Sequence, residues 1–231
     1  MDSTLLDAVE IDPPGKPQAA IIWLHGLGAD GHDFEPLIPQ LGVVGQHAVR
    51  VVLPHAPSRA VTINNGIVMP AWYDIRHAAD FGQAQDSEGI RETERLLHAL
   101  IDREISAGID TSRILLAGFS QGGAVALHTG LRYPRPLAGI LALSAYLPLS
   151  DTLQREAAAA NRAIPVMMAH GVHDPVVPLA LAEQSRAELE RLGYAVDWHT
   201  YPMPHAVCPE EIDDIRSWLF RTLGLNRTDQ T

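Results

Sequence analysis

The chain has 231 residues, within the roughly 200–250 residues that one α/β domain commonly occupies. Hydrophobic residues make up 46% of the sequence, enough for one large core, and the formal net charge of −11 argues against nucleic acid and anionic membranes as partners. With one cysteine, Cys208, no intramolecular disulfide can form, and the N-terminal residues carry no signal-peptide pattern. We therefore expect a cytoplasmic protein, and the longest apolar stretch, residues 136–149, is too short to span a membrane.

Apolar strand patterns alternate with helix patterns along the chain. Most strands are continuous apolar runs, which is typical of a parallel sheet covered on both faces, and they are predicted over residues 21–25, 50–54, 113–118, 137–144, 164–170 and 195–201. Helices are predicted over residues 86–107, 179–192 and 210–223, with another after Ser120. This order predicts an α/β fold with a doubly wound, mostly parallel sheet and helices on both faces. We expect a single domain over residues 1–231, ending in a polar tail at 225–231.

One segment breaks the alternation. Residues 60–75 are predicted to form a small hairpin, with Asn65-Gly66 as a favoured tight turn, followed by an apolar loop. We treat about residues 60–80 as an insertion near the functional site. Its large apolar side chains either cap the sheet core or line an apolar binding pocket, and we favour the pocket, lined by Ile67, Val68, Met69 and Trp72.

The strand over 113–118 leads into Gly118-Phe119-Ser120-Gln121-Gly122-Gly123 and then into a helix pattern. A G-x-S-x-G motif between a buried strand and a helix is typical of the nucleophile elbow of serine hydrolases. Ser120 must occupy a very sharp turn there, and only glycine fits at positions 118 and 122. The motif predicts Ser120 as a nucleophile.

A serine hydroxyl needs a base, and in this arrangement an acid and a histidine follow the serine in that order, each after a later strand. Asp174 follows the strand over 164–170, and His205 follows the strand over 195–201. We therefore predict the triad Ser120, Asp174 and His205. His170 and His173 flank the acid, but no third ligand has a recognisable spacing, so we expect no metal.

The first strand runs into Gly26, Gly28 and Gly31, which spell the dinucleotide-binding pattern G-x-G-x-x-G. That pattern also needs an acidic residue about 20 positions further on, at the end of the second strand, and none is present there. A hydrolase instead needs backbone N–H groups aimed at the oxyanion. We predict the N–H groups of Leu27 and Gln121 as those donors, and we expect His25 to orient the Leu27 loop.

Together these motifs resemble the phospholipase/carboxylesterase family of α/β-hydrolases, which includes bacterial carboxylesterases and acyl-protein thioesterases. The matching segments are LHGLGADGHDF (24–34), MPAWYDI (69–75), GFSQGG (118–123), GVHDPVVP (171–178) and PMPHAVCPEEI (202–212). The resemblance implies the same triad and oxyanion donors, hydrolysis of esters or thioesters with short to medium acyl chains, no cofactor and often a homodimer. It also implies that the loop around Met69 and Trp72 covers the acyl pocket. Pro204 departs from the family, where glycine often precedes the histidine.

We therefore expect a carboxylesterase whose substrate is a small-molecule acyl ester or thioester, with acyl-protein thioesterase or lysophospholipase activity as the alternative at the same site. Two other classes stay open at this point. A non-catalytic binding module could use the same fold. A nucleotide-dependent oxidoreductase is disfavoured by the missing acidic residue.

Overall fold

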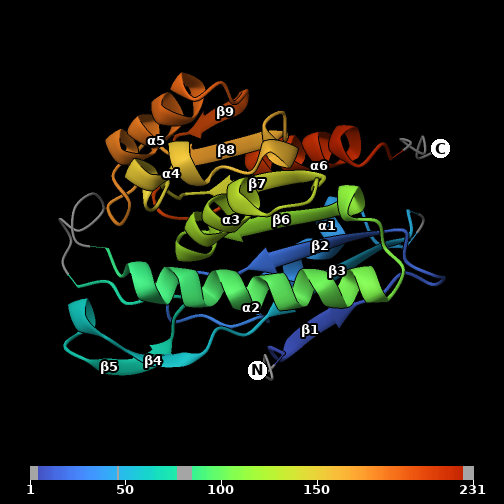
Figure 1. Ribbon diagram of the computed structural model, residues 1–231, viewed down its shortest axis with the longest axis horizontal. Coiled ribbons are helices and arrows are strands. Elements are labelled where there is room, and N and C mark those ends of the chain that lie inside the picture. Colours follow the sequence, from blue (N-terminus) through green and yellow to red (C-terminus); the bar gives the residue numbers. More distant parts are fainter. Residues whose placement is uncertain (1–4, 46, 77–84, 226–231) are drawn as a thin grey trace.

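A computed structural model describes residues 5–45, 47–76 and 85–225 of the chain (Figure 1). Its centre is a seven-stranded sheet in the order β1-β3-β2-β6-β7-β8-β9. The strands are β1 Ala8–Ile11, β2 Ala19–Leu24, β3 Val49–Pro54, β6 Ile114–Phe119, β7 Gly139–Leu143, β8 Val166–Gly171 and β9 Val196–Tyr201. Neighbouring strands run parallel except for β1, which pairs antiparallel with β3. The predicted α/β fold is confirmed, and each of the six predicted strands is present.

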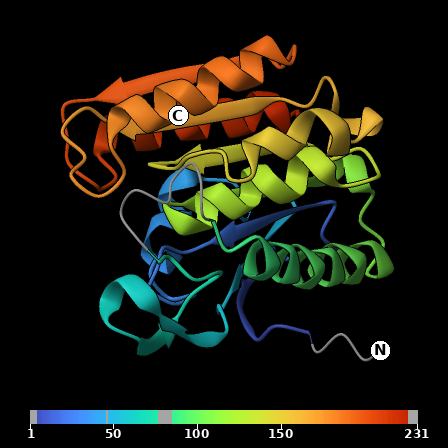
Figure 2. The ribbon, with the colours of Figure 1, turned by 60° about the vertical axis from the view of Figure 1, so that its left-hand side comes forward.

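Helices cover both faces of the sheet (Figure 1, Figure 2). They are α1 Ile38–Leu41, α2 Ser87–Ser106, α3 Gln121–Arg132, α4 Ser150–Glu156, α5 Leu179–Arg191 and α6 Pro209–Thr222. One buried apolar cluster joins the sheet to α2, α3, α4 and α5, and a second joins the opposite face to α1 and α6. The predicted helices start and end within a residue of the observed ones. Asp86 caps α2 by accepting the Gly89 N–H at 3.1 Å.

The hairpin is present, but its turn is longer than expected. Strands β4 (Ser58–Val61) and β5 (Ile67–Pro70) pair antiparallel at one end of the molecule (Figure 2). A short 3₁₀ turn at Thr62–Asn64 precedes Asn65 and Gly66, whose φ angles are 55° and 75°. Both residues adopt the left-handed conformation that the predicted tight turn requires, yet they close a five-residue loop. Residues 77–80 of the predicted insertion, and 226–231 of the predicted tail, lie outside the described residues.

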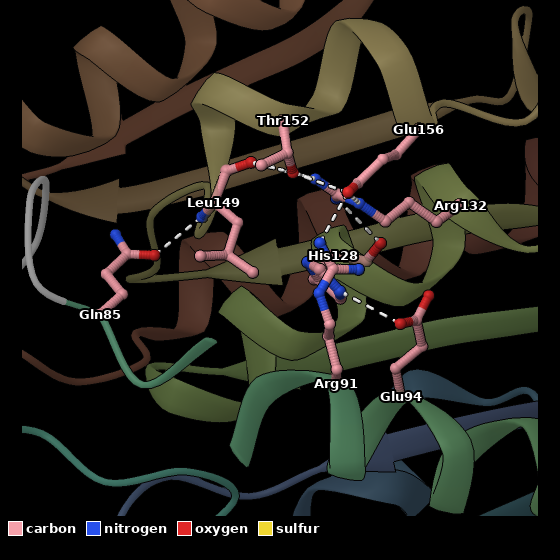
Figure 3. A network of polar contacts seen from close by, with 8 residues as sticks. All are labelled: Gln85, Arg91, Glu94, His128, Arg132, Leu149, Thr152 and Glu156. Carbon is pink, nitrogen blue, oxygen red and sulfur yellow. Dashed lines mark hydrogen bonds and ion pairs between the residues drawn. The ribbon is translucent and has the colours of Figure 1, made fainter. Parts of the chain in front are cut away.

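The end of α3 that lies away from Ser120 is anchored by a polar network (Figure 3). The Arg132 guanidinium donates to Glu156 at 2.8 Å, to the Leu149 carbonyl at 3.0 Å and to Thr152 at 2.9 Å. Arg91 on α2 donates to the same Glu156 carboxylate at 2.6 Å. Burial alone would raise the pKa of Glu156, but the hydrogen bonds from Thr152, Arg132 and Arg91 outweigh it and lower that pKa to about 2. The network thus ties α3 to both α2 and α4.

Candidate active site

Ser120 occupies the sharp turn between β6 and α3. Its φ and ψ angles are 56° and −122°, a conformation that residues with a side chain rarely adopt. A Cβ on Gly118 would lie 2.4 Å from the Gly122 carbonyl carbon, and a Cβ on Gly122 would lie 2.4 Å from the Leu24 oxygen. Because these contacts leave no room for a side chain, the two glycines are steric requirements of the turn, as the motif predicts.

Asp174 and His205 are in direct contact. Asp174 Oδ2 lies 2.6 Å from His205 Nδ1, and the Asp174 side chain is fully buried. The other carboxylate oxygen, Oδ1, accepts the N–H groups of Val176 at 2.8 Å and Val177 at 2.9 Å. These two backbone bonds fix the carboxylate, so that its free oxygen points at the histidine and holds one imidazole orientation.

A second histidine supports the Asp174 loop. His170 is buried at the end of β8, and its Nε2 lies 2.8 Å from the Val177 carbonyl, to which it donates, and 3.4 Å from Asp174 Oδ2. Burial lowers the pKa of His170, so its neutral form is favoured. His173 is exposed. Within the part of the chain that the structure describes, no three metal-ligating side chains gather at one point.

The His205 ring lies beside the elbow. Its centroid is 4.7 Å from that of Phe119, the residue before Ser120. Because β6, β8 and β9 run parallel, the residues that follow them meet at one edge of the sheet. The Ser120 hydroxyl forms no hydrogen bond with any described residue. The structure therefore joins Asp174 to His205 and places His205 beside the elbow, while the bond from Ser120 to His205 is not formed.

The predicted oxyanion donors lie on the loop after β2 and at the start of α3, which meet at the elbow. A Cβ on Gly26 would be 3.5 Å from the Ser120 Cβ, so the loop that carries Leu27 passes directly over the serine. Gln121 is the first residue of α3, where N–H groups have no acceptor within the helix. The Leu27 N–H donates to no described residue. Both N–H groups are thus available to an oxyanion.

The glycines of the G-x-G-x-x-G pattern have local steric roles. Gly28 has a φ of 78°, and its N–H donates to the Pro70 carbonyl at 2.9 Å, which attaches the loop to β5. A Cβ on Gly31 would lie 2.3 Å from the Leu53 carbonyl oxygen. These contacts are a sufficient reason for the pattern without a nucleotide.

His25 orients the loop, as predicted. Its Nδ1 donates to the Gly26 carbonyl at 2.7 Å, and its Nε2 accepts the Ala56 N–H at 3.1 Å. Burial lowers the pKa of His25, which favours the neutral ring that these two bonds require.

The predicted pocket residues separate into three environments. Ile67 and Val68 are 59% and 66% exposed on the hairpin, and Met69 is half-buried, with its sulfur 3.3 Å from Asn64 Nδ2. Trp72 is fully buried and its indole N–H donates to the His25 carbonyl at 2.8 Å. Trp72 is therefore a core residue that is bonded to the segment leading to Leu27. The prediction that it lines the pocket wall is corrected.

Comparisons with known proteins place this chain in a family. The model of the phospholipase/carboxylesterase family matches residues 7–223. The chain belongs to this family. It is a serine hydrolase that acts on carboxylic ester or thioester bonds. No helix in the described part of this family member is long and apolar enough to cross a membrane.

Similar members of the phospholipase/carboxylesterase family are called acyl-protein thioesterases. Acyl-protein thioesterase 1 of Cryptococcus neoformans is 37% identical over 236 residues, covering 95% of this chain and 99% of that protein. Acyl-protein thioesterase 1 of Neurospora crassa is 41% identical over 213 residues, covering 89% of this chain and 87% of that protein. The crystal structure of Zea mays acyl-protein thioesterase 2 superposes with a TM-score of 0.82 at 29% identity, covering 94% and 99% of the two chains.

Two features of the site could not be found from sequence. The Gln121 side chain and the Trp72 indole both bond to backbone groups of distant segments. No spacing or motif signals such a bond, because its partner is set by the packing of the whole fold.

Proposed function

We propose that this chain hydrolyses acyl thioesters on proteins, with Ser120 as the nucleophile and His205 and Asp174 as its partners. The short contact between Asp174 and His205 beside the elbow carries the assignment of the residues. The acyl-protein thioesterases that match nearly the whole chain favour a thioester over the simple carboxylic ester expected from the sequence.

In this mechanism His205 Nε2 takes the proton of the Ser120 hydroxyl as the oxygen attacks the acyl carbonyl. The N–H groups of Leu27 and Gln121 stabilise the oxyanion. His205 then gives the proton to the departing thiol, and the acyl group remains on Ser120. A water molecule attacks this acyl-enzyme with the same base, which releases the fatty acid and restores the serine.

Asp174 has an electrostatic and a geometric role in each step. It accepts a hydrogen bond from His205 Nδ1, so the proton-free nitrogen of the neutral ring is Nε2, on the serine side. It also stabilises the imidazolium that forms when the serine proton is transferred. The missing Ser120–His205 bond is expected to form when substrate binds, since catalytic hydrogen bonds often tighten only then.

The acyl chain is proposed to lie along the hairpin side of the site. Ile67 and Val68 are large apolar side chains left exposed, and the hairpin is bonded to the Leu27 loop through Gly28 and Pro70. Met69 adjoins the same loop, because a Cβ on Gly28 would meet its sulfur at 3.6 Å. A flexible methionine suits a wall that accepts chains of different length.

A single domain over residues 1–231, a cytoplasmic location and a homodimer complete the proposal. Light scattering on the purified protein measures the last of these, and the mass of one chain would contradict it. No cofactor enters the mechanism.

A matched pair of peptides tests the proposed substrate. One carries an S-acyl cysteine and the other an O-acyl serine, with the same acyl group and flanking residues. We expect a higher kcat/KM for the thioester, and loss of both activities in Ser120→Ala. Hydrolysis of the ester alone would restore the carboxylesterase expectation, and thioesterase activity in Ser120→Ala would overturn the nucleophile.

A further inference from the structure

The Gln121 side chain, as distinct from its backbone N–H, clamps a separate segment of the chain. Gln121 is 3% exposed. Its Oε1 accepts the Trp72 N–H at 2.8 Å, and its Nε2 donates to the Tyr73 carbonyl at 2.8 Å. Both hydrogen-bonding functions of the amide are therefore used on adjacent backbone groups, which fixes the first residue of α3 against the segment after β5.

The clamped segment is itself bonded to the loop that carries Leu27. The Trp72 indole N–H donates to the His25 carbonyl at 2.8 Å, and the Thr93 hydroxyl donates to the Trp72 carbonyl. Continuous hydrogen bonds thus run from Gln121 through Trp72 to His25, two residues before Leu27.

We propose that the Gln121 amide and the Trp72 indole are positioning residues that set the separation of the two oxyanion donors. The inference rests on the proposed function. One donor belongs to the loop after β2 and the other to the first residue of α3, and a transition-state charge is stabilised only when both are held ready at the right distance. The two side chains act in series, since each forms one step of the same connection.

Three substitutions remove the connection in steps. Gln121→Met keeps the length of the side chain and removes both amide bonds. Gln121→Glu keeps an acceptor for the Trp72 N–H and removes donation to Tyr73. Trp72→Phe keeps a buried ring and removes donation to His25.

The chain offers a matched control in Asn161. This amide is 1% exposed, accepts the Leu137 N–H at 2.9 Å and donates to the Tyr133 carbonyl at 2.8 Å, away from Ser120. Asn161→Leu removes a backbone clamp of the same kind. Its effect on melting temperature measures the structural cost of such a loss, and we expect its kcat to equal that of wild type.

The test measures kcat and KM of each variant with an activated acyl ester. It also measures the inhibition constant of an alkyl boronic acid, which forms a tetrahedral adduct with a catalytic serine. Gln121→Met and Trp72→Phe should each lower kcat about 10- to 100-fold, as expected for a misplaced catalytic group, with KM changed little. Boronic acid affinity should fall by the same factor. The kcat of the double variant should be no lower than that of the less active single variant, because the bonds act in series.

The pH at which kcat/KM is half-maximal should stay at the wild-type value, because these variants leave Asp174 and His205 in contact. A folded Gln121→Met with wild-type kcat, or an Asn161→Leu that loses kcat equally, would overturn the clamp. If Gln121→Met does not fold, Trp72→Phe decides by the same criteria. Failure of the proposed function is distinguishable, since wild type would then leave the S-acyl peptide intact or Ser120→Ala would keep its activity, and neither result depends on Gln121 or Trp72.

Discussion

His205 Nδ1 lies 2.6 Å from Asp174 Oδ2, while Asp174 Oδ1 is bound by the backbone N–H groups of Val176 and Val177. In Asp174→Asn the oxygen of the amide should stay on those N–H groups, which turns its NH₂ group toward His205. The ring must then accept at Nδ1 and carry its proton on Nε2, where it can no longer take the serine proton.

We expect Asp174→Asn to lower kcat about 10⁴-fold at neutral pH with little change in melting temperature. Steady-state kinetics and thermal unfolding measure the two effects. A loss of less than tenfold in a folded variant would show that Asp174 does not orient the base.

Gly118→Ala tests the steric account of the elbow. The added methyl group would lie 2.4 Å from the Gly122 carbonyl carbon, so the turn or β6 must move. We expect the free energy of unfolding to fall by about 3 kcal/mol or more. Gly15→Ala is the control, because nothing lies within 4 Å of its Cβ, and it should leave stability near wild type. Equal unfolding midpoints in denaturant for the two variants would refute the steric account.

Met69→Ala tests the proposed acyl wall. We expect kcat/KM to fall for long acyl chains and to change little for acetyl esters. The fall should be at most about 0.8 kcal/mol, or about fourfold in kcat/KM, for each methylene of the substrate that loses its contact. The measurement is kcat/KM across esters from acetyl to dodecanoyl. Ile63→Ser, a change of an exposed apolar residue in the hairpin turn, is the control and should keep the wild-type profile. A uniform loss at every chain length together with a lower melting temperature would assign Met69 to the core.

Glu211, in the first turn of α6, is expected to make the free energy of unfolding depend on pH. Burial raises its pKa to about 8, and the nearby Cys208 N–H offsets this only in part. Its carboxyl oxygens have no well-formed hydrogen bond among the described residues. The pKa of Glu211 is higher in the folded protein than in the unfolded chain. Its contribution to the free energy of unfolding is therefore fully present below about pH 4.5 and is lost as pH rises to about 8.

The substitution Glu211→Gln mimics the protonated form and removes this pH dependence. The stability of wild type relative to Glu211→Gln should fall between pH 5 and pH 8.5, by a difference on the order of 3 kcal/mol. Denaturant unfolding of both proteins at the two pH values measures it. A stability difference that is the same at both pH values would contradict the raised pKa.

The parallel strands could be predicted because most of them are continuous apolar runs, as β6 and β8 show. Strand β1 could not, since its four residues are only partly buried at the sheet edge and include an exposed Glu10. Helix α4, Ser150–Glu156, is likewise too short for a clear helical period.

For the site, chain order was enough to select Asp174 and His205, because the ends of parallel strands share one edge of the sheet. Trp72 was assigned to the pocket from its apolar character and from the family resemblance of its loop. Trp72 is instead fully buried, and it forms hydrogen bonds with His25 and Gln121, which are far away in the sequence. Contacts of this kind follow from tertiary packing and have no local pattern.

The most direct test of the central claim is to identify the nucleophilic residue. Wild type is incubated with an alkyl fluorophosphonate, which reacts with activated serines, and the adduct is mapped by peptide mass spectrometry in parallel with thioester hydrolysis. The account predicts one adduct, on Ser120, with loss of activity in proportion to labelling and no labelling of Ser120→Ala. An adduct on another serine, or full activity in the labelled protein, would contradict it.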